Sequence, residues 1–182
     1  MHLGEECADV AAEAVAALAN CPEQAAEDVL AAILRADRVF LTGQGRTGLI
    51  ARAFAQRLMQ LGLRCFVVGD TTTPAIGRSD VLVACSGSGE TSLTLKLVEQ
   101  AKGLGATVVA VVGRADCSLA DLADVAAVIT DPRQDASDDS ILPLGSRFEL
   151  ALFVFLEVLL LRLMRRLRVS EADMRSRHAN LE

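Results

Sequence analysis

The chain has 182 residues, the length of one domain or of one domain with a short appendage. Hydrophobic residues make up 52% of it and charged residues 23%, which excludes a disordered chain, a collagen-like repeat and a disulfide scaffold, and leaves apolar surface for subunit contacts. The net charge is −6 and Trp and Tyr are absent, so binding of nucleic acid is not expected, because it depends on basic patches and stacking rings.

Cysteine usage indicates a reducing compartment. The five cysteines are an odd number, are widely spaced and form no CxxC pair, which argues against a disulfide framework and a zinc site. The N-terminus is acidic and shows no apolar secretory leader. We therefore expect a cytoplasmic protein.

Two helices are predicted first, in the Ala-rich stretch 5–36. The segment Asn20-Cys21-Pro22 separates them, and Pro22 suits the first position of the second helix, because the N–H that proline lacks has no partner there. In that second helix, Val29, Leu30, Ile33 and Leu34 form one apolar stripe.

Short apolar runs then alternate with helical patterns. The runs lie at 39–41, 65–68, 81–85, 108–112 and, more weakly, 127–129. Continuous apolar runs indicate strands covered on both faces, as in a parallel sheet. The helical patterns lie at 47–61, 91–104 and 119–123, whereas the link from 68 to 81 is too short for a long helix. The alternation predicts an α/β sandwich.

The last helical pattern, 150–164, is strongly apolar. It is shorter than the roughly 20 residues of a membrane span and contains Glu157 and Arg162, so we expect a buried or subunit-interface helix. No repeat or linker divides the chain. We predict a single domain over 1–182, with N-terminal helices at 1–36, an α/β core at 37–168 and a C-terminal tail at 169–182.

Two predicted turns lie where a strand ends and a helix begins, the place at which open α/β sheets bind ligands. The first, 42–48, reads TGQGRTG, and the second, 86–91, reads SGSGET. With Asp70 near the end of the next strand, the first turn matches the dinucleotide-binding pattern GxGxxG. The hydroxyls of the second turn, set among glycines, instead favour a terminal phosphate group, and few residues remain for the substrate domain of a dehydrogenase.

Each turn also has a plain structural explanation. Gly43 and Gly45 suit any strand-to-helix turn, and Glu90 suits the first turn of a helix, where an acid complements the helix dipole. SGSGET is more specific, because a purely structural turn rarely needs so many hydroxyls and glycines together. The residues alone therefore indicate a phosphorylated small molecule as the ligand.

SGSGET after an apolar strand resembles the sugar isomerase (SIS) domain family. Three further stretches, GDTTTPA at 69–75, PLGSRFE at 143–149 and RHANLE at 177–182, are similar to its 6-phospho-3-hexuloisomerase branch. The resemblance implies an α/β fold, a three-layer sandwich with a five-stranded parallel sheet flanked by helices. It also implies interconversion of D-arabino-3-hexulose 6-phosphate and fructose 6-phosphate, the second step of formaldehyde fixation by the ribulose monophosphate route. It further implies no metal or organic cofactor, and a homotetramer with sites at subunit boundaries.

The resemblance also implies the site residues. Glu149 is expected to carry a proton between C2 and C3 through a cis-enediol, although a Ser146-x-x-Glu149 capping box would explain its position equally well. His178 is expected to reach the site from a neighbouring subunit and to move protons among the substrate oxygens, although a terminal histidine can simply be exposed. The residues expected to bind the phosphate and the sugar are Gly45, Arg46, Thr47, Ser86, Gly87, Ser88, Thr91 and Ser146.

Five alternatives stay open. Glu182 and the threonines at 71–73 are weaker site candidates, and Asp131, Asp135, Asp138 and Asp139 would suit a solvated loop better than a metal site. A non-catalytic SIS sensor of sugar phosphates would need the hydroxyl loop but neither Glu149 nor His178. A small dinucleotide-binding domain is the least favoured alternative.

Overall fold

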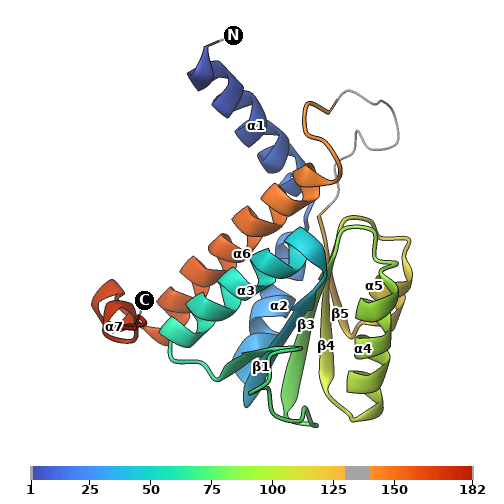
Figure 1. Cartoon of the computed structure of the whole chain (residues 1–182), viewed down its shortest axis with the longest axis vertical. Helices are drawn as coiled ribbons and strands as arrows, with labels where there is room; N and C mark the ends of the chain where they lie inside the picture. The colour runs from blue at the N-terminus through green and yellow to red at the C-terminus, as the bar shows by residue number, and fades with distance from the viewer. Residues whose placement is uncertain (1, 130–139, 182) are drawn as a thin grey trace.

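The computed structural model describes residues 2–129 and 140–181. Its five strands form one parallel sheet in the order β2-β1-β3-β4-β5 (Figure 1). The strands are β1 (Arg38–Gly43), β2 (Cys65–Val67), β3 (Asp80–Ser86), β4 (Thr107–Val112) and β5 (Val125–Val128). The predicted parallel sheet is confirmed, and because the strands are parallel, all their carboxyl ends lie at one edge.

Helices cover both faces of the sheet. The elements are α1 (Leu3–Leu18), α2 (Glu23–Arg35), α3 (Gly45–Gln60), α4 (Ser92–Gly103), α5 (Ser118–Leu122), α6 (Ser146–Leu167) and α7 (Glu171–Ser176). Helices α2, α3 and α6 pack on one face, where alternate β3 residues such as Val81 and Val83 are buried, and α4 and α5 pack on the other, against Leu82 and Ala84. This period of two, with both faces buried, explains the continuous apolar runs of the sequence.

Three details differ from the predictions. Pro22 is the N-cap of α2 instead of its first residue, because its backbone is still extended. The weak strand at 127–129 begins two residues earlier, at Val125. The tail contains the short helix α7, which no apolar period marked but which Ser170 caps by accepting a hydrogen bond from the Asp173 N–H.

Helix α6 extends across the sheet, and helix α1 projects from the body of the molecule. Helix α6 begins beside the start of α3, crosses the sheet and ends beside α7, while α1 packs on the first turns of α6 and projects away from the body (Figure 1). Among the helices that residues 2–129 and 140–181 form, none is long and apolar enough to cross a membrane.

Candidate active site

The two predicted ligand loops meet at the centre of the sheet edge. Strands β1 and β3 are neighbours, but the chain leaves β1 towards α3 on one face and β3 towards α4 on the other. Such a switch point opens a crevice between the loops. The structure therefore brings together the β1–α3 loop and the serine loop, which we define as residues 86–91.

Glycines allow these segments to approach closely. A Cβ atom on Gly48 would lie 2.5 Å from the carbonyl oxygen of Gly43. The β1–α3 loop therefore packs tightly against the first turn of α3, and the absence of a Cβ on Gly48 allows this contact. A Cβ on Gly87 would lie 3.0 Å from the ring of Phe148, in the first turn of α6. The serine loop thus touches α6 as well, and three segments distant in the sequence form one site.

Three helices begin at this site without a side-chain cap. The N-cap residues are Gln44 for α3, Thr91 for α4 and Gly145 for α6. Neither the Gln44 nor the Thr91 side chain accepts a hydrogen bond from its helix, and Gly145 has no side chain. The first N–H groups of a helix lack intrahelical partners and carry the positive end of the helix dipole. An anion placed between the three helix starts would meet these groups.

The predicted hydroxyls of the serine loop have different surroundings. Ser86 is buried, and its Oγ accepts a hydrogen bond from the Gly89 N–H at 3.1 Å and lies 3.0 Å from Thr91 Oγ1, so it shapes the loop from within. Ser88 is exposed and accepts a hydrogen bond from the Glu90 N–H at 3.1 Å. Binding of a phosphate by these hydroxyls stays a prediction.

Glu90 serves the structure, as the alternative explanation predicted, although at a different helix. Its carboxylate accepts hydrogen bonds from Ser118 N and Ser118 Oγ, both at 2.7 Å, at the start of α5. The backbone and hydroxyl hydrogen bonds from Ser118 lower the pKa of Glu90. The acid thus ties the serine loop to α5 and complements the dipole of α5, not that of α4.

Glu149 lies beside Arg46. Arg46 Nε is 2.9 Å from Glu149 Oε2, and Arg46 Nη1 donates a hydrogen bond to Ser146 Oγ at 3.4 Å. The side chain of Glu149 is 13% exposed, and its Oε2 is buried without a hydrogen bond from the described residues. The site thus contains a shielded carboxylate whose charge one arginine balances.

The capping-box explanation of Glu149 is wrong. Gly145, with a left-handed φ of 82°, occupies the N-cap of α6, and Ser146 is already helical. Ser146 and Glu149 both face Arg46 instead, so the tertiary contact replaces the local one. Gly45 and Thr47 stand with Arg46 in the first turn of α3, where Gly45 has a φ of 57°.

His178 is not at this site in its own chain. It follows α7 and is exposed, and the neighbouring Arg177 donates a hydrogen bond to the carbonyl of Gln60, the last residue of α3. Helix α6 has 22 residues and spans about 33 Å, with Glu149 in its first turn and the tail beyond its far end. One chain therefore cannot present Glu149 and His178 to one small substrate.

A pocket of about 440 Å³ adjoins the β1–α3 loop, and Arg52, one of its lining residues, forms an ion pair that the sequence did not reveal. The pocket extends between the ends of β1 and β2 and the first turns of α3 and α4. Arg52 in α3 donates to Asp70, with Nη2 and Oδ1 2.6 Å apart. The acid of the dinucleotide pattern is thus engaged in an ion pair.

Some predictions fall outside the described residues. These are Glu182 and the four aspartates Asp131, Asp135, Asp138 and Asp139. Within residues 2–129 and 140–181, no cluster of His, Cys, Asp and Glu could hold a metal ion. Thr73 lies in the described part, where its hydroxyl donates a hydrogen bond to the carbonyl of Val67 at 2.5 Å.

Comparisons with known proteins agree with the fold. The model of the SIS domain family matches residues 32–154. The 3-hexulose-6-phosphate isomerase of Mycobacterium gastri is 42% identical, covering 98% of this chain and 87% of its own. The enzyme of that name from Bacillus subtilis is 32% identical, covering 100% of both chains.

A solved structure shows the same similarity. It is a hypothetical protein of Methanococcus jannaschii, from whose structure the function of 3-hexulose-6-phosphate isomerase was inferred. It is 30% identical, covers 98% of this chain and 99% of its own, and superimposes with a TM-score of 0.85. The resemblance read from the sequence is confirmed: this chain belongs to the SIS domain family.

Proposed function

We propose that this protein is an isomerase that interconverts D-arabino-3-hexulose 6-phosphate and fructose 6-phosphate, as the second step of formaldehyde fixation by the ribulose monophosphate route. The observation that carries the proposal is the buried Oε2 of Glu149, which is ion-paired with Arg46 at 2.9 Å but accepts no hydrogen bond from the described residues, in the first turn of α6 and beside the first turn of α3. The names of the relatives support the choice of sugar phosphate. A sensor would need the anion site but no shielded base.

The phosphate end of the substrate would bind at the helix starts. Free N–H groups of α3 and α4 would take its oxygens, together with the hydroxyls of Thr47, Ser88 and Thr91. Ser86 would act by holding the loop in shape, and Gly45 and Gly87 by letting the phosphate approach the backbone. Arg46 would supply positive charge between the phosphate and Glu149, and Ser146 would contact the sugar.

The proton transfer would then use a single carboxylate. Glu149 removes the proton from C2 of the 3-ketose, and the electron pair of the C–H bond forms the C2–C3 double bond of a cis-enediol. The proton on the C2 hydroxyl moves to the C3 oxygen, and Glu149 returns its proton to C3. C2 is oxidised and C3 reduced by the same two electrons, so the reaction as written needs no added oxidant, reductant or organic cofactor.

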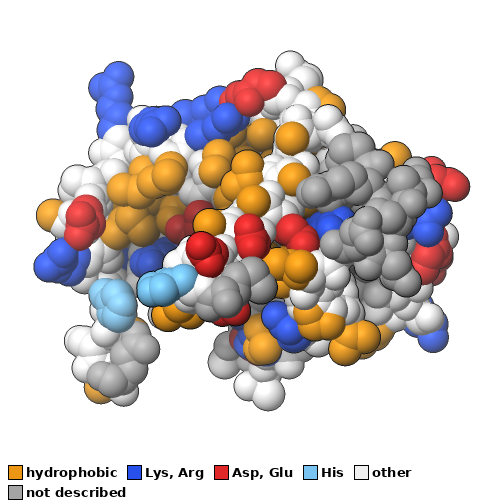
Figure 2. All heavy atoms as spheres, turned by 90° about the horizontal axis from the view of Figure 1, so that it is seen from above, with side chains coloured by type: hydrophobic (Ala, Val, Ile, Leu, Met, Phe, Trp, Pro, Cys, Tyr) orange, Lys and Arg blue, Asp and Glu red, His pale blue; other side chains and the backbone are white. Residues whose placement is uncertain are grey.

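His178 would come from a second subunit, in a homotetramer whose sites lie at subunit boundaries. An apolar groove of about 550 Å³ runs between α1 and α6, where Phe153 is 44% exposed. Figure 2, which looks onto the end of the molecule from which α1 projects, shows hydrophobic side chains in several surface groups. Burial of such surface favours association of copies, which can bring the tail of one chain to the site of another.

A direct assay tests the activity. The protein is incubated with D-arabino-3-hexulose 6-phosphate, and fructose 6-phosphate is followed through a coupled enzyme. We expect turnover by the native protein and none by Glu149→Gln, which keeps the shape of the side chain but cannot accept the proton. Binding of fructose 6-phosphate by the variant, measured by thermal shift, should persist, whereas a variant with near-native turnover would disprove the role of Glu149.

Subunit mixing tests the shared site. We expect the Glu149→Gln and His178→Ala variants each to be inactive or impaired. When a subunit of one variant lies next to a subunit of the other, one of the sites between them contains both native residues. Random mixing of equal amounts should therefore restore about a quarter of the native sites. No recovery in mixed oligomers whose composition is verified by native mass spectrometry would exclude a site built from Glu149 of one chain and His178 of another.

The direction of the reaction gives a separate test of His178. Fructose 6-phosphate closes into a ring, whereas the 3-ketose has no free hydroxyl placed to form a five- or six-membered ring. Ring opening is thus needed only when fructose 6-phosphate is the substrate. We expect His178→Ala to slow that direction more than the other, and equal losses in both directions would contradict a role in ring opening.

A further inference from the structure

Glu13 of α1 is a buried carboxylate that accepts three hydrogen bonds, and the proposed chemistry does not use it. Its Oε1 accepts a hydrogen bond from Ile141 N at 2.9 Å, and its Oε2 accepts from Ser140 Oγ at 2.6 Å. Arg147 Nε also donates to Oε2, at 2.8 Å. The side chains of Glu13 and Arg147 are both 11% exposed, so this ion pair is shielded from water.

These three donors come from the segment that leads into the active site. Ser140 and Ile141 precede the Pro143 turn, and Arg147 lies in the first turn of α6, one residue after Ser146 and two before Glu149. We define residues 140–147 as the entry segment. A carboxylate from the other end of the chain, more than 120 residues away, thus holds both sides of the turn that sets the start of α6.

The entry segment needs such an anchor. Leu144 and Gly145 have left-handed φ angles of 52° and 82°, and α6 begins without a side-chain cap. Leu144 is fully exposed, so packing does not hold the turn. A non-glycine residue in the left-handed region is strained and persists only where surrounding contacts impose it.

We infer that Glu13 is a positioning residue, which fixes the entry segment and thereby the placement of Ser146 and Glu149. The inference rests on the proposed function for its catalytic consequence, but the anchoring itself does not. A carboxylate suits the task, because it accepts hydrogen bonds from a hydroxyl, a backbone N–H and a guanidinium at once. It also gives α1, which packs mainly on α6, a direct connection to the site.

The anchor should operate throughout the neutral pH range. Burial by itself would raise the pKa of Glu13, but the hydrogen bonds from Ser140, Arg147 and Ile141 outweigh burial and lower it to about 2. Arg147, Ser140 and Ile141 are the groups that face the carboxylate in the described part of the chain. The carboxylate therefore stays charged above pH 4.5, and a change in the neutral pH profile is not expected from its titration.

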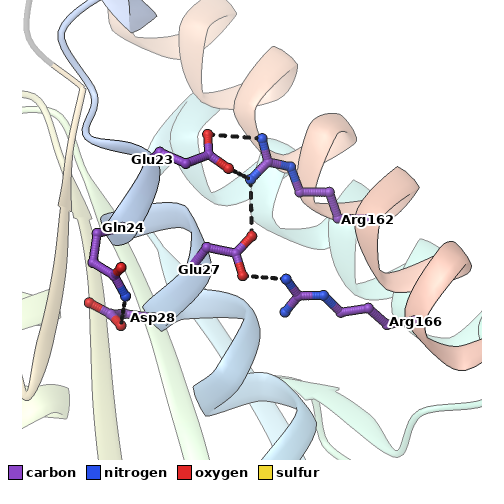
Figure 3. A network of polar contacts seen from close by, with 6 residues as sticks. All are labelled: Glu23, Gln24, Glu27, Asp28, Arg162 and Arg166. Carbon is purple, nitrogen blue, oxygen red and sulfur yellow. Dashed lines mark hydrogen bonds and ion pairs between the residues drawn. The ribbon is translucent and has the colours of Figure 1, made fainter.

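Glu13→Gln is the test variant, because it keeps the side-chain size and replaces one accepting oxygen with a donating NH₂ group. Its matched control is Glu27→Gln. Glu27 lies in α2 and pairs with Arg162 and Arg166 near the far end of α6 (Figure 3). Both variants remove a carboxylate that joins an N-terminal helix to α6, but only Glu13 contacts the entry segment.

Two measurements decide the inference. Amide hydrogen exchange of residues 140–149 should become at least tenfold faster in Glu13→Gln and stay unchanged in Glu27→Gln, with the serine loop unaffected in both. In the isomerase assay, kcat should fall by about tenfold or more in Glu13→Gln, because a small displacement of a catalytic group is costly, while KM changes less than twofold. Glu27→Gln should keep both constants.

Each outcome has one meaning. Unchanged exchange at 140–149 disproves the anchor, whether or not the native protein proves to be an isomerase. Faster exchange with an unchanged kcat disproves the positioning role and leaves Glu13 as a structural residue. If Glu13→Gln does not fold, Ser140→Ala, which removes one of the three donors, should show the same changes at smaller amplitude, and its failure to do so overturns the inference.

Discussion

Gly48→Ala tests whether close packing of the β1–α3 loop is a real constraint on the fold. Gly48 lies in the first turn of α3, where alanine would ordinarily be the better residue. A Cβ there would stand 2.5 Å from the carbonyl oxygen of Gly43, 3.0 Å from its carbonyl carbon and against backbone alone. Backbone atoms cannot rotate away as a side chain can, so the loop itself would have to move.

The matched control is Gly103→Ala, at the last residue of α4, where a Cβ would have no neighbour within 4 Å. Alanine gains up to about 1 kcal/mol of helix propensity over glycine at each position. Forcing a group into a filled space costs about 1–3 kcal/mol. Since the propensity gain favours both variants, Gly48→Ala should be less stable than Gly103→Ala by about 1–3 kcal/mol.

The free energies of unfolding are measured by urea denaturation at one protein concentration, because assembly makes stability concentration-dependent. A difference of this size corresponds to roughly 2–12 °C in Tm for a chain of this length. Phosphosugar binding should also weaken in Gly48→Ala, since Arg46 and Thr47 move with the loop. Equal stability of the two variants within about 0.5 kcal/mol would refute the reasoning, because that is the usual range of a neutral substitution.

Three further predictions concern buried or bridging groups. Burial alone would raise the pKa of Asp80, but the hydrogen bonds from Arg38, at 2.9 and 2.6 Å, outweigh burial and lower this pKa. The Asp80 carboxylate therefore stabilises the fold above pH 3.8, and its contribution to stability is lost as the pH falls further. Asp80→Asn should therefore cost about 2 kcal/mol at pH 7 and flatten the acid limb of a stability profile, and an unaltered acid limb would contradict the pairing. Burial raises the pKa of the Cys85 thiol to about 12, whereas Cys7 is exposed. A maleimide at pH 8 should therefore label Cys7 in the native protein and Cys85 only after unfolding, and mass spectrometry can identify the labelled cysteines. Glu90→Gln should speed amide exchange at the start of α5, because the hydrogen bonds that lower the pKa of this carboxyl come from that helix, and unchanged protection there would refute the tie.

The sequence by itself determined the sheet and the place of the two loops that we predict to bind the ligand. A strand buried on both faces must be apolar along its whole length, and a strand-to-helix turn that approaches a ligand closely needs glycine. Both features therefore produce recognisable patterns in consecutive residues, such as 81–85 and 86–91. The serine loop, the start of α3 and the start of α6 were all predicted as site segments, and the structure brings them together. The family resemblance rested on the serine loop and on three further short stretches, at 69–75, 143–149 and 177–182.

Only the tertiary structure decided what the polar side chains contact. Glu149 matched a local capping box, yet it pairs with Arg46, about 100 residues earlier in the chain, and the turn before it is held by Glu13 from the first helix. Glu90 suited the helix that follows it but bonds to α5. A carboxylate can find donors on many neighbours of equal chemical type, and which neighbour it meets depends on how the helices pack against the sheet. No local pattern carries that information, so these contacts follow from the assembled fold alone.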